Sequence, residues 1–342
     1  MNKFFNPEIT SWSSLVQRPL YSLDSVKDVV DGIFNNVELY GDKSLIDYTN
    51  KFDNVKLSHL KINADKISNS EKNIGKELKD AINIAFDNIY KFHENQIYKS
   101  KKIETTKGVL CWQEKRAIEN VGLYIPGGTA PLFSSVLMLA IPAMIAQCKN
   151  IVLCSPPDKN GELHPAILYC AKLCKIDTVI SVGGAQSIAA MSLGTETVPK
   201  VNKIFGPGNQ FVTYAKLKSI NFNTAIDMPA GPSEVFIISN EIKNTRIIAA
   251  DLLSQLEHGS DSRAVLLSLN KHLLENVKVE VKKQLKGLAR QNILKESINN
   301  LVLINFKNID DLINFSNENA PEHLIIPDTN LTSLLPKILN AG

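Results

Sequence analysis

Val121-Gly122-Leu123-Tyr124-Ile125-Pro126-Gly127-Gly128-Thr129 is an apolar run that ends in a glycine turn, and it opens a pattern that repeats along the chain. From about residue 120 onward, short β-branched runs alternate with segments of helical length. Such alternation predicts parallel strands joined by crossover helices, the α/β class. The strands are too many for one small sheet, so we expect two Rossmann-like parallel sheets. The predicted strands are 121–125, 151–154, 178–182, 203–205, 235–239, 265–269, 301–305 and 324–326.

The residues before this region have the spacing of amphipathic helices. One apolar face is formed by Val26, Val29, Val30, Ile33, Phe34 and Val37, and Gly41-Asp42 closes that helix. We therefore expect a helical N-terminal lead-in. The predicted division is an N-terminal helical arm over 1–24, a discontinuous α/β domain of 25–120 plus 235–342, and a second α/β domain over 121–234.

Composition excludes several classes of protein. The 342 residues are 44% hydrophobic and 21% charged, with a net charge of +3, as in a globular protein with room for two cores. No basic block suggests a nucleic-acid partner. The most apolar stretch, 131–146, contains Ser134, Ser135 and Pro142 and is shorter than the ~20 residues that span a membrane, so we expect a buried helix there.

The cysteines point to a reducing compartment. Their number, five, is odd, and no CxxC pair occurs, which argues against a disulfide framework. Cys170 and Cys174 lie one helical turn apart, and a buried apolar face explains them better than metal ligation. The N-terminus lacks the apolar core of a signal peptide. We expect a cytoplasmic protein.

Three glycine turns follow predicted strands and lead into helices, at residues 124–129, 182–187 and 205–210. A helix that starts after glycines presents free backbone N–H groups, which favour an anion such as a pyrophosphate. Tight strand-to-helix turns need glycine with or without a ligand, and none of the three matches the GxGxxG fingerprint. The turns alone therefore predict an unnamed ligand at the strand ends, contacted by Tyr124 as a flat stacking surface and by the amides of Gln186 and Asn209.

The segment 245–259 is predicted to be a helix with Gly259 as its C-cap. Gln255 and His258 are three residues apart and so share a face near its end. An amide oxygen and an imidazole could be two ligands of a divalent metal, although a closed tetrahedral site takes four. The alternative is that His258 is a favourable cation at a helix C-terminus.

Two further polar positions precede predicted strands. Glu322 and His323 stand before the apolar run 324–326, and histidine is the side chain best suited to proton transfer near neutral pH. A solvated loop pair is the alternative. The loop 227–234 contains two prolines, which would hold Ser233 as a fixed hydroxyl donor or simply make a structural turn.

Taken together, these segments resemble histidinol dehydrogenase along nearly the whole chain. The resemblance is carried, in family order, by the segments 121–132, 205–211, 225–235, 252–259 and 321–326. Tyr40-Gly41-Asp42 and Lys51-Phe52-Asp53 also resemble the helical N-terminal part of that family. Five ordered segments are far more specific than any single glycine turn.

The resemblance implies the last step of histidine biosynthesis, the two-step oxidation of L-histidinol to L-histidine through histidinaldehyde with two NAD⁺. It implies that 121–234 binds NAD, through Tyr124, Gln186 and Asn209, and that the discontinuous domain is catalytic. It implies zinc held by Gln255 and His258, which also face the substrate with Ser233 and His323. Glu322 and His323 would be the acid/base pair, and the family is a homodimer.

The chain departs from the family at its end. The family continues through an Asp-bearing segment and a later histidine that complete the zinc site, so this C-terminal part of the family fold is absent from the 342 residues. We therefore expect a fragment of a longer reading frame that binds zinc weakly. One alternative is an inactive NAD-binding or dimerisation remnant of the enzyme. Another is a related enzyme of the same fold that oxidises a different amino alcohol.

Overall fold

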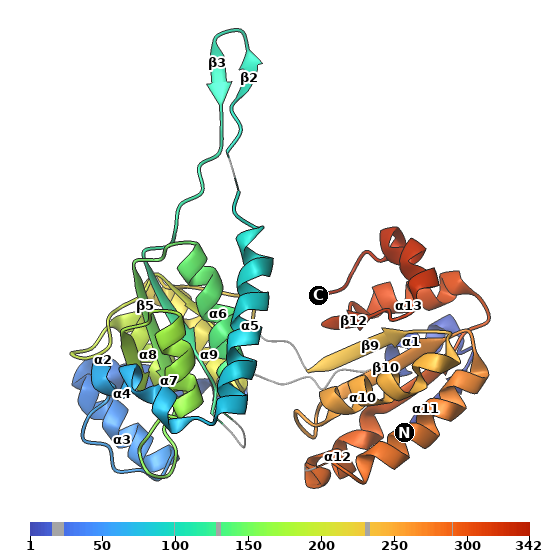
Figure 1. Ribbon diagram of the computed structural model, residues 1–342, viewed down its shortest axis with the longest axis horizontal. Helices are drawn as coiled ribbons and strands as arrows, with labels where there is room; N and C mark the ends of the chain where they lie inside the picture. The colour runs from blue at the N-terminus through green and yellow to red at the C-terminus, as the bar shows by residue number, and fades with distance from the viewer. Residues whose placement is uncertain (16–23, 99, 128–130, 230–232, 289) are drawn as a thin grey trace. The chain divides into compact units, whose positions relative to one another are not determined.

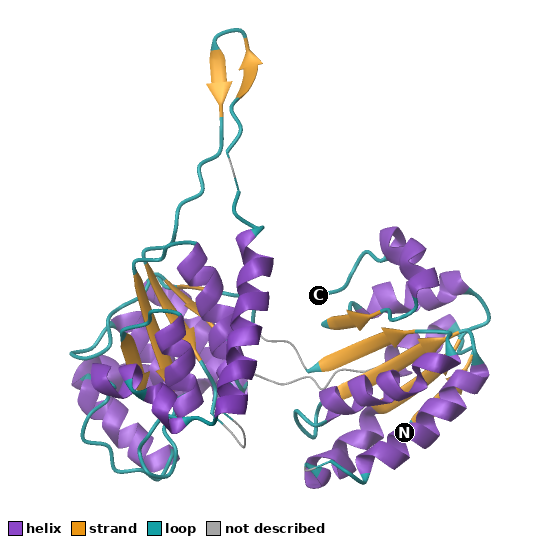
Figure 2. Ribbon diagram, viewed as in Figure 1, coloured by secondary structure: helices purple, strands orange, loops and turns teal. Residues whose placement is uncertain are grey.

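The computed structural model describes residues 1–15, 24–98, 100–127, 131–229, 233–288 and 290–342. Its contacts divide the chain into two compact units, residues 1–20 with 231–342 and residues 21–230 (Figure 1). Each unit contains a five-stranded parallel sheet, called sheet A in the first and sheet B in the second, between layers of helices (Figure 2). The predicted α/β class with two Rossmann-like sheets is confirmed.

Sheet B is doubly wound about its first strand. The strand order is β6 (Thr178–Ser181), β5 (Asn150–Ser155), β4 (Asn120–Tyr124), β7 (Lys203–Phe205) and β8 (Ala225–Ile226), all parallel. The chain thus adds two strands on one side of β4 and then crosses to the other side. That reversal between β4 and β7 is the topological switch point, where open α/β sheets bind ligands at the carboxyl ends of strands.

Helices cover both faces of sheet B. One face carries α2 (Asp24–Tyr40), α3 (Asp42–Phe52), α8 (Gly184–Leu193) and α9 (Gln210–Ser219), and the other carries α5 (Lys76–Glu94), α6 (Phe133–Ile145) and α7 (Pro165–Leu173). The predicted apolar face of α2 is largely buried, as its helical spacing requires, although Val29 is 49% exposed. The apolar stretch 131–146 is a buried helix as predicted, and none of the described helices is long and apolar enough to cross a membrane.

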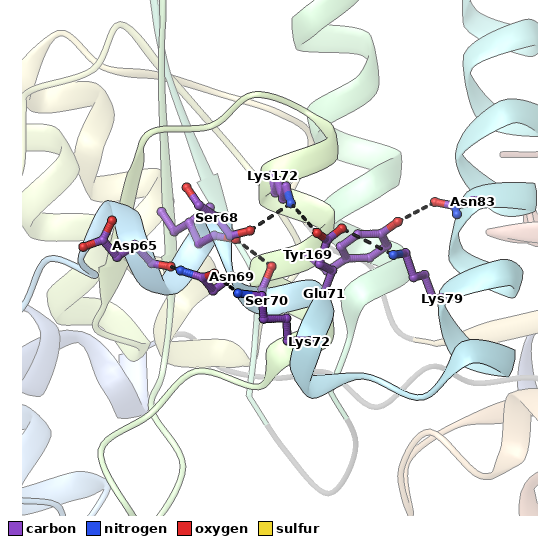
Figure 3. A network of polar contacts seen from close by, with 11 residues as sticks. Asp65, Ser68, Asn69, Ser70, Glu71, Lys72, Lys79, Asn83, Tyr169 and Lys172 are labelled. Carbon is purple, nitrogen blue, oxygen red and sulfur yellow. Dashed lines mark hydrogen bonds and ion pairs between the residues drawn. The ribbon is translucent and has the colours of Figure 1, made fainter.

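The structure groups the N-terminal helices differently from the predicted division. Residues 25–120 were expected to join 235–342, whereas they belong with sheet B. Figure 3 shows one reason: α4 (Ala64–Ser68) and the 3₁₀ turn η2 (Ser70–Asn73) are tied to α5 and α7 by polar contacts. Lys172 of α7 donates to the Ser68 carbonyl (2.8 Å) and pairs with Glu71 (3.3 Å), whose pKa is lowered by Lys172 and Lys79. An amphipathic pattern predicts that a helix face is buried but not which sheet buries it.

Sheet A has the order β1 (Asn2–Phe5), β11 (Leu301–Asn305), β10 (Arg263–Ser268), β9 (Glu234–Ile238) and β12 (His323–Ile325), again all parallel. From β9 onward it is wound like sheet B, with β12 crossing to the other side of β9, and the N-terminal strand β1 is added at the edge beside β11. One face packs on α10 (Thr245–Leu256), α11 (Lys271–Leu285) and α12 (Gln291–Ser297); the other packs on α1 (Trp12–Leu15) and α13 (Ile309–Asn319). The remaining 3₁₀ turns are Ile9–Ser11, Ile220–Phe222, Ile242–Asn244, Ile298–Asn300 and Thr329–Lys337.

The start of the chain corrects a second prediction. Residues 1–24 were expected to form a helical arm, but Asn2–Phe5 is the edge strand β1, paired with β11 in the register Asn2 to Val302. The short helix α1 that follows buries Trp12 edge-on against Phe306 and Phe315. A four-residue strand whose partner lies at the far end of the chain leaves no local periodicity to detect.

A β-hairpin extends from the sheet-B unit (Figure 1). Its strands, β2 (Ile103–Thr106) and β3 (Val109–Cys111), are antiparallel and exposed throughout. Several large apolar side chains of this segment face solvent, namely Ile97, Tyr98, Ile103, Val109, Leu110 and Trp112. An exposed apolar surface of this kind suits contact with another polypeptide.

Candidate active site

One cavity of about 600 Å³ brings together three predicted ligand contacts. Tyr124 ends β4, Gln186 lies in the first turn of α8, and Asn209 immediately precedes α9, so all three stand at the carboxyl edge of sheet B beside its switch point. The other lining residues are Val29, Ile33, Phe52, Asp53, Gly127, Pro156, Pro157, Gly184, Ala185 and Phe211. Doubly wound sheets bind nucleotides at this place.

Tyr124 holds the second glycine turn as well as lining the cavity. Its side chain is buried, and its hydroxyl oxygen accepts a hydrogen bond from the Gly184 N–H (3.2 Å). Burial raises the pKa of Tyr124 to about 12, and the negative charge of Asp53 also raises it. The phenol therefore stays protonated at neutral pH. The stacking role of its ring stays a prediction.

The third glycine turn is fixed by an ion pair between the buried Lys216 and the partly exposed Asp227. Gly206 has φ +133°, and a Cβ there would lie 2.1 Å from the Tyr124 carbonyl oxygen, so only glycine fits. The Gly206 N–H donates to Asp227 Oδ2 (2.8 Å), and the buried Lys216 ammonium donates to the Gly206 carbonyl (2.7 Å) and pairs with Asp227. Lys216 was not among the predicted site residues, because nothing in the local sequence distinguishes a lysine that will be buried.

Asn209 is the N-cap of α9. Its Oδ1 accepts hydrogen bonds from the Phe211 and Val212 N–H groups, both at 3.1 Å. The carbonyl half of the amide is thus engaged in the helix start, and the NH₂ half is the part that can donate to a ligand.

The cavity suits a dinucleotide by its donor set. The N-terminal ends of α8 and α9 contribute backbone N–H groups and positive dipole ends, which suit a pyrophosphate. Proline and phenylalanine side chains in the wall suit flat rings, and the Asp53 carboxylate is a hydrogen-bond acceptor. Of the first predicted glycine turn, Gly127 lines the cavity, whereas Gly128 and Thr129 lie outside the described residues.

A second group of predicted residues meets at the amino ends of the sheet-A strands. Glu322 and Glu234 form a reciprocal pair: the Glu322 N–H donates to Glu234 Oε1 and the Glu234 N–H donates to Glu322 Oε2, both at 3.2 Å. His323 begins β12 opposite Val235. Ser233 precedes β9 and is half-buried, while Glu322 and His323 are exposed. The Glu322 carboxylate is thus pinned to the backbone, which the solvated-loop alternative did not foresee.

A buried ion pair lies beneath this group. Arg263, the first residue of β10, is in register with Glu234, and their side chains pair although both are almost fully buried. Glu234 therefore links Arg263 to Glu322. This pair was not among the predicted site residues. A detectable signal was present, since charged residues at the first position of two neighbouring apolar strands would meet in a parallel sheet.

Gln255 and His258 lie at the end of α10. That helix ends at Leu256 with Glu257 as C-cap, so the prediction of a helix to a Gly259 cap is wrong; the Glu257 N–H still bonds to the Leu253 carbonyl four residues back (3.0 Å), but the His258 N–H bonds to a carbonyl only three residues back, which tightens the chain out of the α-helix. Gln255 is 9% exposed, and His258 is exposed, with its N–H donated to the Gln255 carbonyl (3.2 Å). Within the described ranges, no three His, Cys, Asp or Glu side chains form a group that could hold a metal.

Comparison with known proteins places these features in one family. A family model described as histidinol dehydrogenase matches residues 16–342. The histidinol dehydrogenase of Bacteroides thetaiotaomicron is 49% identical over 98% of this chain and 78% of that protein, and the one of Campylobacter jejuni is 47% identical over 96% and 76%. The crystal structure of histidinol dehydrogenase from Elizabethkingia anophelis superposes with a TM-score of 0.96 at 46% identity, covering all of this chain and 79% of the other.

Proposed function

The chain belongs to the histidinol dehydrogenase family, and from that premise we propose that it oxidises L-histidinol to L-histidine through histidinaldehyde, with two NAD⁺ as oxidants. The observation that carries the NAD⁺ part is the cavity at the switch point of sheet B, where Tyr124, Gln186 and Asn209 converge from three separate turns. Each of the two oxidations transfers one hydride to NAD⁺, and one water is added between them.

The acid/base part of the proposal rests on Glu322 and His323. His323 is exposed at the start of β12 and removes the hydroxyl proton as the carbinol carbon loses hydride. Glu322 helps to activate the water that adds to the aldehyde, and the Glu234 N–H holds one oxygen of its carboxylate. We assign substrate contacts to Ser233, Gln255, His258 and His323.

Zinc is proposed on family membership, with Gln255 and His258 as the donors of this chain that suit it. An amide oxygen and an imidazole nitrogen are acceptable zinc ligands, but a site needs three or four protein ligands. The described residues do not by themselves complete such a set. No step is therefore derived through the ion. Gln255→Ala should lower the zinc content of the purified chain relative to wild type, and an unchanged content would remove Gln255 from the site.

The activity is tested by histidinol-dependent NADH formation with two NADH per histidinol. His323→Asn and Glu322→Gln should each lower kcat by about 10²–10⁴-fold, the usual contribution of a general acid or base. His272→Asn changes an exposed histidine of α11 and is the matched control. When histidinaldehyde replaces histidinol, His323→Asn should recover more activity than Glu322→Gln. No NADH with histidinol, but turnover of another amino alcohol, would instead support a related enzyme of the same fold.

The remaining parts of the proposal are a homodimer and a cytoplasmic location. The exposed apolar β2–β3 hairpin favours contact with a second copy, and Trp112→Glu should shift the mass measured by light scattering towards the monomer.

All five cysteines are free, in agreement with a reducing compartment. The presence of both Glu322 and His323 and the family match over residues 16–342 favour the enzyme over an inactive remnant.

A further inference from the structure

Asp53 is a wall residue of the cavity to which the sequence analysis gave no role. It follows the last residue of α3 and caps that helix, its N–H donating to the Thr49 carbonyl (2.9 Å). The residue therefore reaches the cavity from a helix that covers sheet B, and not from one of the sheet's own glycine turns. It shares the cavity wall with Tyr124, Gln186 and Asn209.

The Asp53 side chain is half-buried, and its two carboxylate oxygens are not equally enclosed. Within the described part of the chain, its Oδ2 atom is buried and has no hydrogen-bond partner. Burial raises the pKa of Asp53, as expected for a carboxylate that has lost water without gaining a donor. Because Oδ2 is enclosed by the protein, a ligand in the cavity can meet only the rest of the Asp53 side chain, which lines the cavity wall.

The kind of donor follows from the place of Asp53 in the fold. An ionised carboxylate accepts hydrogen bonds and cannot donate them, so the ligand must bring hydroxyl or N–H groups. In dinucleotide-binding folds, an acidic residue at the end of the second strand accepts the ribose hydroxyls. The second strand of sheet B is β5, and Pro156 and Pro157 follow it in the cavity wall. The nearby Asp158 is engaged elsewhere, since its Oδ1 accepts the N–H groups of Asn160 (2.8 Å) and Glu162 (3.0 Å).

We propose that Asp53 accepts hydrogen bonds from the adenosine ribose hydroxyls of NAD⁺ and makes the cavity select NAD⁺ over NADP⁺. This inference rests on the proposed function of the cavity as the NAD⁺ site. The 2′-phosphate of NADP⁺ would replace a hydroxyl donor by a group that accepts only, and would bring negative charge next to the carboxylate. Asp53 thus takes the role that the acid after the second strand has in other dinucleotide folds, from a different part of the chain.

The test measures the binding of NAD⁺ and NADP⁺ by calorimetry, without turnover, for wild type, Asp53→Asn and Asp53→Ala. Both variants should raise the Kd for NAD⁺ by about 10-fold, the effect of losing about 1.4 kcal/mol. Their Kd for NADP⁺ should stay the same or fall, so the NAD⁺ preference shrinks. Asp158→Asn, which removes a carboxylate just beyond β5, is the matched control and should keep both values.

Thermal unfolding separates a ligand-binding role from a structural one. Because the Asp53 carboxylate is desolvated and one of its oxygens is unpartnered, Asp53→Asn should unfold at the same or a higher temperature than wild type. Equal weakening of NAD⁺ and NADP⁺ binding with a lower unfolding temperature would overturn the inference in favour of a structural role. An unchanged preference in Asp53→Asn would also overturn it. Wild type that binds neither nucleotide would overturn the proposed cavity function itself.

Discussion

From β9 and β4 onward, sheets A and B are wound alike, with two strands added on one side before the chain crosses to the other, but they differ in what stands at the switch point. In sheet B, the carboxyl ends of β4 and β7 open into the cavity that contains Tyr124 and Asn209. In sheet A, the corresponding place beyond β9 and β12 is occupied by the side chain of Asp328, which is completely buried. The same topology thus yields a ligand cavity in one unit and an internally filled site in the other.

Asp328 is held as a bound anion would be. Its two oxygens accept hydrogen bonds from the Ser239 hydroxyl (2.6 Å), the Asn240 N–H (2.6 Å), the Glu241 N–H (3.2 Å) and the Asn244 amide (2.8 Å). Successive backbone N–H groups after a parallel strand attract anions, whether a ligand's or the protein's own. The comparison teaches that the winding of the sheet provides an anion-attracting edge, and that the residues at this edge decide whether it stays available.

The residues proposed for acid/base chemistry in the sheet-A unit lie at the opposite edge. Glu322 and His323 stand at the amino end of β12, next to Ser233 at the amino end of β9. This placement agrees with the comparison, because the carboxyl edge at the sheet-A switch point is filled by Asp328. The predicted NAD⁺ contacts thus lie at the carboxyl ends of parallel strands, where ligands usually bind, whereas Glu322 and His323 lie at the amino end of a strand.

The largest expected effect comes from emptying the filled site. Asp328→Ala leaves two backbone N–H groups and two side chains without their acceptor, and should lower the free energy of unfolding by about 3–5 kcal/mol. Urea denaturation measures this loss. Added phosphate should restore part of the stability of the variant and little of that of wild type. A loss below about 1 kcal/mol would show that Asp328 does not act as the internal anion.

A smaller loss is expected from the ion pair that holds the open site. Lys216→Met leaves the Asp227 carboxylate without its cation and frees the Gly206 turn, and should cost about 2–3 kcal/mol of stability and weaken NAD⁺ binding. The control is Lys218→Met, which removes a more exposed lysine of the same helix α9. Lys218 pairs with Asp31 of α2, and its loss should cost less than about 1 kcal/mol. Equal losses of unfolding free energy in the two variants would contradict the prediction that the burial of Lys216 makes its ion pair the more important one.

Asn209 separates helix capping from ligand binding. Asn209→Ala removes the N-cap of α9 and should cost about 1 kcal/mol, together with NAD⁺ affinity. Asn209→Asp keeps an acceptor for the Phe211 and Val212 N–H groups but removes the NH₂ donor, so NAD⁺ affinity should fall while stability is kept. Denaturation and calorimetry on both variants distinguish the two roles. Full NAD⁺ affinity in Asn209→Asp would argue for capping alone.

The smallest effect is a pH dependence at Asp53. Because burial raises the pKa of this carboxyl in the folded state, its ionised form opposes folding, and the cost is lost as the pH falls through the folded pKa. Asp53→Asn should therefore be slightly more stable than wild type at neutral pH. The difference should shrink towards zero as the pH approaches the usual Asp value of 3.8. Unfolding curves over this pH range would contradict the prediction if the difference grew instead.

Local sequence was enough for the strands and for the residues at their ends. Short β-branched runs predicted eight parallel strands close to their observed bounds, because a strand buried on both faces must be apolar along its length. The glycine turns placed Tyr124, Gln186 and Asn209 at strand ends that the sheet then brings to one edge. The family resemblance, carried by five ordered segments, is confirmed by the comparisons.

Tertiary structure alone decided the features that depend on distant partners. The choice of the sheet that buries the N-terminal helices and the pairing of the edge strand β1 both depend on residues far apart in the sequence. Whether an aspartate lies near hydrogen-bond donors likewise depends on packing. Asp328 accepts four hydrogen bonds, whereas Oδ2 of Asp53 accepts none from the described residues. Periodicity and turn chemistry act over a few residues, so they determine elements, whereas burial and charge pairing are properties of the assembled fold.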